Sequence, residues 1–95
     1  MPELSRFYGI IIGIFYLDHG APHVHVFTGG TASAVRKADY AAKLRISDGK
    51  VIDGKLPSAQ NKLVQAWLVL HHDELIRAWE NASLGRVPGK IAPLR

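Results

Sequence analysis

The hydrophobic pattern of this chain changes its period near Leu56, and this change limits the fold more than any other feature. Before Leu56 the apolar residues form continuous or alternating runs, which are typical of strands. After Leu56 they recur every three to four residues, as on one face of a helix. A run of strands followed by helices predicts the α+β class, with an antiparallel sheet and helices packed on one face.

The strand half, about residues 1–56, is predicted to hold about four strands. Residues 7–17 are almost all apolar, which predicts one strand buried on both faces. Gly9 and Gly13 would share a face of that strand, where a close-packed neighbour would compensate for the missing side chains. Alternation predicts two further strands, at residues 23–28 and 40–47. Asp48-Gly49 then predicts a hairpin into a fourth strand at residues 50–53.

The helical half, about residues 57–85, begins at Pro57, a residue suited to a first helical turn. The acidic residues of His72-Asp73-Glu74 favour a new helix start there, so we expect two helices that meet near His71, with one kinked helix as the alternative. Gly85 and Pro88 are typical of residues that follow a helix end. The tail, residues 86–95, is expected to be extended, either laid on the domain or loose.

A chain of 95 residues has the length of one domain, so we assign residues 1–95 to a single domain. It contains no cysteine, which excludes disulfides and thiolate chemistry and leaves His and carboxylate as metal ligands. The apolar run at residues 7–17 is shorter than the ~20 residues that span a bilayer. Glu3 before it and the Asp18-His19 that ends it do not fit a signal peptide. We therefore expect a cytoplasmic protein with no membrane segment.

The segment from Asp18 to His25 carries three of the five histidines. His23 and His25 lie two apart on a predicted strand, so their rings should project from one face with Cβ atoms about 6–7 Å apart. His19, across a turn that contains Pro22, could supply a third metal ligand, with Asp18 as a ligand or hydrogen-bond partner.

Four interpretations of this segment stay open at the level of sequence. The first is a site for a divalent metal such as zinc, formed by Asp18, His19, His23 and His25. The second is acid–base chemistry or phosphate contact, as in metal-free RNA cleavage, in which two of the three histidines act as general base and general acid near pH 7. The third is architectural, with each ring bonded to nearby backbone, and the fourth is contact with a partner protein.

The net charge of +4 favours anionic partners without naming one. Arg36 and Lys37, together with Lys43 and Arg45, could form a basic face beside the histidines that contacts nucleic acid. An ordinary solvated sheet face is the alternative for these four residues.

Four segments of the chain form a recognisable pattern: Ser5–Ile10, Asp18–His25, Gly54–Pro57 and Trp67–Trp79. Through these segments the chain resembles a family of small bacterial proteins that is catalogued only as a domain of unknown function, marked by a D-H-x-P-P-H-x-H motif. Three departures from the family pattern are Ala21 in place of proline, Gly13 in place of a basic residue, and extra sequence at residues 31–39.

The resemblance implies that the three histidines belong to a shared pattern, but it implies no reaction. Members of the family are typically encoded beside a second small uncharacterised protein, as in a toxin–antitoxin pair. The resemblance therefore implies a binding component of a two-protein module, whose partner would be that second protein, with nucleic acid as a further candidate partner. A homodimer is a further expectation for so small a core.

Overall fold

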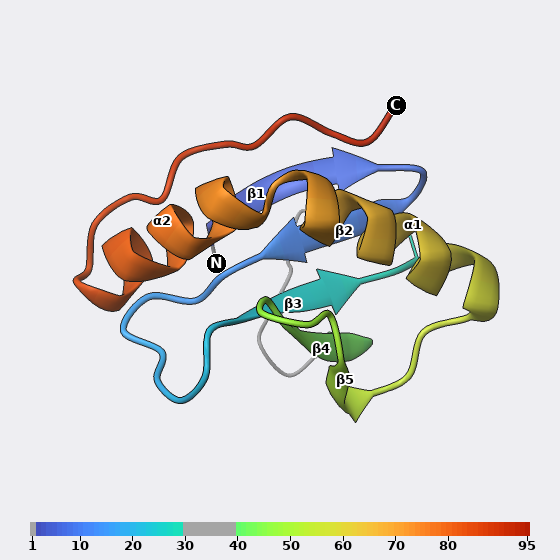
Figure 1. Cartoon of the computed structure of the whole chain (residues 1–95), viewed down its shortest axis with the longest axis horizontal. Coiled ribbons are helices and arrows are strands. Elements are labelled where there is room, and N and C mark those ends of the chain that lie inside the picture. The colour runs from blue at the N-terminus through green and yellow to red at the C-terminus, as the bar shows by residue number, and fades with distance from the viewer. Residues whose placement is uncertain (1, 30–39) are drawn as a thin grey trace.

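In the computed structural model of the chain, which describes residues 2–29 and 40–95, a five-stranded antiparallel sheet is followed by two helices. The strands follow one another in the order of the sequence, so that each pairs with the next (Figure 1). The predicted α+β class is confirmed, with one strand more than expected. The elements are β1 (Glu3–Phe7), β2 (Ile10–Gly13), β3 (His23–Phe27), β4 (Ala42–Arg45), β5 (Val51–Gly54), α1 (Ser58–Leu70) and α2 (His72–Ser83).

The additional strand comes from the apolar run, and the prediction of one strand over residues 7–17 was wrong. Phe7 ends β1 and pairs with Ile10 of β2, so the chain reverses between them. Tyr8 and Gly9 both have positive φ, 48° and 76°, as in the tight turns that join hairpin strands. Gly9 is thus a turn residue and not a packing glycine within a strand. The turn escaped prediction because Tyr8-Gly9 continues the apolar run of β2 and contains no polar turn residue.

The hairpin predicted at Asp48-Gly49 is confirmed, with a turn slightly longer than two residues. Arg45 N–H donates to the Lys50 carbonyl at 2.9 Å and closes the hairpin between β4 and β5. Gly49 has φ of 72°, which explains why glycine stands there.

The strand register separates the two faces of the sheet. Val26 lies opposite Ile12 of β2 and Ala42 of β4, and all three belong to the core that the helices cover. Successive residues of a strand point to opposite faces. His25 therefore points away from this core, between its register partners Gly13 and Lys43.

The two helices lie end to end across one face of the sheet (Figure 1). The chain bends at His71, which has φ of −112° and separates α1 from α2, so the predicted junction is confirmed. Trp67 and Trp79 are both buried, as their places on the apolar stripe predict. Within the described ranges, no helix combines the length and the apolar character that a membrane crossing needs.

The C-terminal tail runs back along the molecule beside β1 (Figure 1). Ile91 is buried, and its N–H donates to the Leu4 carbonyl at 2.8 Å. Trp67 donates its indole N–H to the Ala92 carbonyl at 2.8 Å. The tail therefore covers the outer edge of β1, which would otherwise present unpaired backbone groups.

Candidate metal centre

The connection from β2 to β3 carries Asp18 and is held at both ends by backbone hydrogen bonds. Leu17 N–H donates to the Ala82 carbonyl at 2.9 Å, near the end of α2. At the other end of the connection, Ile46 N–H donates to the Pro22 carbonyl at 2.9 Å. These two bonds place Asp18 beside the start of β3, which explains how a loop residue can take part in a defined site.

His23 contacts an oxygen atom with each of its ring nitrogens. Nδ1 lies 2.8 Å from the carbonyl oxygen of Ala21, and Nε2 lies 3.0 Å from Oδ2 of Asp18. A carbonyl oxygen can only accept a hydrogen bond, so Nδ1 carries a proton and Nε2 faces the carboxylate. The ring is thereby fixed in orientation, as metal-binding imidazoles usually are by a bond from the second nitrogen.

His25 lies beside His23 in a largely aromatic environment. It is fully buried, and its ring centroid lies 5.2 Å from that of His23. The rings of Phe15 and Tyr40 lie edge-on to His25 at 4.6 and 5.0 Å. Trp79 of α2 reaches the ring of His23 at 4.8 Å. These apolar walls lower the local dielectric, which strengthens the interactions of any charge inside them.

The three side chains converge on one small volume. Asp18, His23 and His25 each offer one ligand atom, and these atoms lie within 4.8 Å of one another. Bonds of about 2.0–2.1 Å would set the ligand atoms of a tetrahedral zinc ion about 3.3–3.4 Å apart, so movements of about an ångström close the set. Within residues 2–29 and 40–95, no other group of three such side chains meets this criterion.

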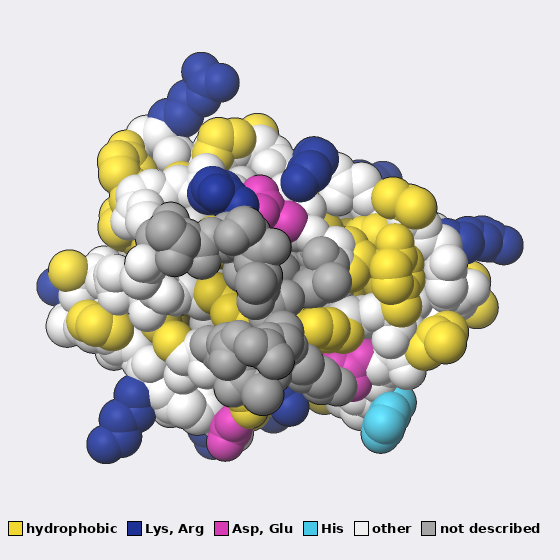
Figure 2. Space-filling view, turned by 180° about the vertical axis from the view of Figure 1, so that it is seen from behind, with side chains coloured by type: hydrophobic (Ala, Val, Ile, Leu, Met, Phe, Trp, Pro, Cys, Tyr) yellow, Lys and Arg dark blue, Asp and Glu magenta, His cyan; other side chains and the backbone are white. Residues whose placement is uncertain are grey.

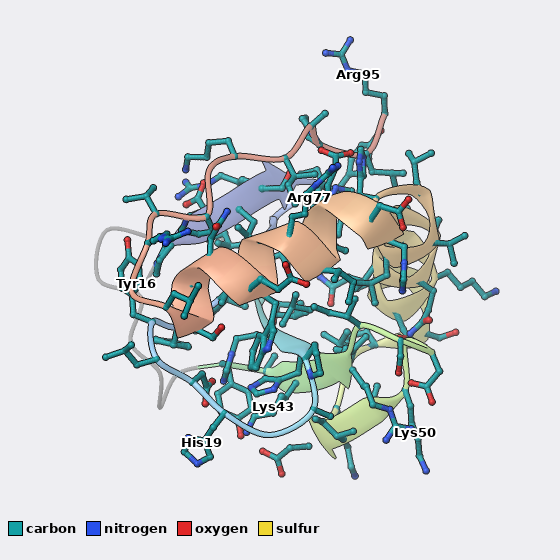
Figure 3. The ribbon with its side chains drawn as sticks, turned by 60° about the vertical axis from the view of Figure 1, so that its left-hand side comes forward. Tyr16, His19, Lys43, Lys50, Arg77 and Arg95 are labelled. Atoms are coloured by element: carbon teal, nitrogen blue, oxygen red, sulfur yellow. The ribbon has the colours of Figure 1, made fainter. Side chains whose placement is uncertain are left out.

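His19, the third predicted histidine, lies outside this cluster. Its side chain is exposed and projects outward from the turn into solvent (Figure 3). Its backbone N–H donates to Oδ1 of Asp18 at 2.9 Å. His19 thus helps to orient the carboxylate through its backbone, and the structure brings together three of the four predicted ligands.

The predicted basic face is described only in part, because Arg36 and Lys37 lie outside the described residues. Lys43 and Arg45 lie opposite His25 and His23 in the β3–β4 register. Arg45 is paired with Asp48 through two contacts of 2.6 and 3.0 Å. Lys43 has its ammonium 5.8 Å from the centre of the Tyr40 ring. In Figure 2, which shows the molecule from the opposite side to Figure 1, the visible Lys and Arg side chains are separated from one another and do not form one basic patch.

Phe15, Tyr40 and Trp79 line the site, and sequence reasoning assigned none of them to it. Trp79 was predicted as core, and its side chain does belong to the core, but its contact with His23 depends on how α2 crosses the sheet. Tyr40 donates its hydroxyl to the carboxylate of Asp53, and this bond raises the pKa of Tyr40. None of the three carried a sequence signal: the approach of Phe15 to His25, for example, follows from the register that pairs Gly13 with His25.

The fold and the site define a small α+β protein with a buried Asp–His–His cluster between a turn and a central strand. A family model described as "Domain of unknown function (DUF4160)" matches residues 9–80, and the chain belongs to this family. The match includes the whole of the cluster. No curated protein and no solved structure shows a significant match to the chain.

Proposed function

We propose that this protein binds a divalent metal ion, with zinc as the best fit, at Asp18, His23 and His25. The observation that carries the proposal is the convergence of the three ligand atoms within 4.8 Å. Because both histidines are buried, the ion would be held inside the fold, where it would fix the connection between β2 and β3 against the sheet.

Zinc suits this donor set better than harder cations do. Imidazole nitrogen and carboxylate oxygen are common zinc ligands, whereas magnesium and calcium prefer sets made only of oxygen. The bond from His23 Nδ1 to the Ala21 carbonyl supplies the outer contact that orients a metal-binding imidazole. Three protein ligands leave the fourth tetrahedral position to water or to another group.

The contacts of His23 also favour a cation at this position. Its Nε2 faces Oδ2 of Asp18 at 3.0 Å, and two lone pairs at that distance would repel each other. A proton on Nε2 or a metal ion bound by both atoms removes the repulsion. Metal binding at this site therefore displaces a proton, and we expect the affinity to fall as the pH falls.

Metal-free RNA cleavage has less support from this arrangement. A general base needs a ring nitrogen within reach of the proton that it abstracts. Both nitrogens of His23 are directed at oxygen atoms of the protein, and His25 has no exposed surface. The same geometry is well suited to holding an ion inside the fold.

Zinc titration of protein purified without a His-tag tests the proposal. Asp18→Asn keeps the shape of the side chain but removes its charge, and His23→Ala removes a ligand. We expect each to weaken zinc binding by at least about 100-fold, the upper range for changes beside metal sites. His19→Ala is the matched control from the same turn and should bind as the wild type does. Equal titration curves for all four proteins would exclude the site.

A second candidate function is that of a cytoplasmic binding component of a two-protein module. The observation that favours it is an apolar surface at the helix junction, where Val69 and Leu70 are 79% and 67% exposed. Val69 lines two hollows, of about 310 and 380 Å³, and Leu70 lines the second of them. Exposed apolar side chains beside concave surface are typical of protein interaction sites.

Co-expression with the product of the neighbouring gene tests this second candidate. We expect a stable complex with the wild type and a weakened complex with Val69→Asp, because the new charge would be buried in the interface. Ile52→Asp places the same charge at an exposed apolar position of β5 and serves as the control. Two proteins that migrate separately in gel filtration would count against a module.

A further inference from the structure

Four exposed apolar side chains meet where the segment after β2 touches the end of α2. Tyr16, Leu17, Leu84 and Val87 are 45%, 69%, 66% and 77% exposed, and we call them the Leu17–Leu84 patch. Tyr16 and Val87 line one hollow of about 230 Å³. Apolar side chains gather at the corresponding, right-hand end of the molecule in Figure 2. Patches of this kind exceed the scattered apolar residues of an ordinary surface.

The patch is held rigidly by backbone contacts. Leu17 has φ of 56°, a left-handed conformation that costs a bulky residue about 1–2 kcal/mol. Its N–H donates to the Ala82 carbonyl, which satisfies a carbonyl at the end of α2. Gly85 continues the chain past the helix, and a Cβ placed there would lie 3.8 Å from Leu17 Cδ2. A patch ordered in advance loses little conformational entropy on binding.

The charges beside the patch are complementary to one another. Glu80 and Arg86 precede and follow Leu84, and both are exposed. Among the described residues, neither side chain forms an ion pair. In a twofold dimer every contact occurs twice with the roles exchanged, so an acidic and a basic side chain on one patch can each pair with the opposite charge on the other copy. A different protein whose binding surface carries a single sign of charge would fit best against a patch bordered only by the opposite sign. The Leu17–Leu84 patch is bordered by both signs.

We propose that the Leu17–Leu84 patch binds the same patch of a second copy of this chain in a twofold dimer. Leu84 would lie near the axis, with Arg86 of each copy facing Glu80 of the other. Dimerisation would remove Leu17, Leu84 and Val87 from water and add buried apolar area to a small core. This inference is independent of the metal centre, because none of its residues is a proposed ligand.

Sedimentation equilibrium of the full chain, over micromolar to millimolar concentrations, tests the dimer. We expect a reversible monomer–dimer equilibrium for the wild type. Leu84→Asp should raise the dissociation constant by at least about 30-fold, as loss of a central interface contact does. Val69→Asp is the matched control, because it places the same charge at an exposed apolar position outside the Leu17–Leu84 patch.

Charge reversal tests the orientation of the two copies. Arg86→Glu alone should weaken the dimer, and Glu80→Arg added to it should restore the wild-type dissociation constant. Far-UV circular dichroism checks that each variant is folded. A wild type that stays monomeric throughout, or equal effects of Leu84→Asp and Val69→Asp, would overturn the proposal. Failure of the double variant to recover would overturn the pairing of Glu80 with Arg86.

Discussion

The imidazole of His23 lies between the Ala21 carbonyl and the carboxylate of Asp18, at 2.8 and 3.0 Å. Sequence spacing predicted that His23 and His25 share a face of a strand, and the register agrees with it. The position of Asp18 could not be predicted from the sequence in the same way. It depends on two backbone hydrogen bonds that fix the connection between β2 and β3 to distant elements. The spacing of the histidines could not predict the orientation of His19, whose ring points into solvent in the structure (Figure 3).

Backbone geometry at single glycines gives a prediction at the same scale. A Cβ at Gly54 would lie 2.1 Å from the Ala41 carbonyl oxygen, whereas a Cβ at Gly9 would meet nothing within 4 Å. Both residues have positive φ, so both alanine variants carry left-handed strain. We expect Gly9→Ala to cost about 1–2 kcal/mol of unfolding free energy and Gly54→Ala at least about 3 kcal/mol. Urea unfolding measures both, and equal losses would contradict the close approach at Gly54.

At the scale of elements, the helices and strands that could be predicted from the sequence are those whose ends carry turn residues or charged residues typical of a helix start. Asp48-Gly49 marked the β4–β5 hairpin, and the acidic residues after His71 marked the start of α2. The β1–β2 hairpin was missed because its turn, Tyr8-Gly9, lies within a continuous apolar run. The positive φ values of Tyr8 and Gly9 and the antiparallel register of β1 and β2 reveal the hairpin in the structure.

The β4–β5 hairpin should respond to acid through Asp48. The guanidinium of Arg45 and the N–H of Lys50 hold the pKa of Asp48 well below its usual range. A carboxyl whose pKa is lowered by folding stabilises the protein above its unfolded pKa of about 4, and this contribution is lost as the pH falls further. We expect the difference in melting temperature between wild type and Asp48→Asn to shrink below about pH 4. A difference that stays constant from pH 7 to pH 3 would contradict this role.

At the scale of the whole molecule, the tail and the connection between β2 and β3 link parts that are distant in sequence. Ile91 joins the core and bonds to Leu4 of β1, while Leu17 bonds to Ala82. The sequence left the tail either packed or loose, because a single buried residue among prolines and glycines gives no periodic signal. The aromatic walls of the candidate site were unpredictable for the same reason: Phe15, Tyr40 and Trp79 come from three separate segments.

The tail gives a prediction about global stability. Ile91→Ala removes a buried side chain, and we expect a loss of about 2 kcal/mol or more in unfolding free energy. Val87→Ala is the matched control in the same tail, because Val87 is 77% exposed. It should change stability by less than about 0.5 kcal/mol. Urea unfolding of the two variants checks both values, and similar losses would mean that the tail does not pack at Ile91.

The most direct test of the metal centre is a crystal structure of the zinc-loaded protein with anomalous data collected at the zinc absorption edge. The convergence of Asp18, His23 and His25 predicts a peak between these three side chains, about 2.0–2.2 Å from a carboxylate oxygen and two imidazole nitrogens. The exposed ring of His19 should lie outside the coordination sphere. A peak located only at exposed histidines such as His19 or His72, with the cluster unchanged, would contradict the metal centre.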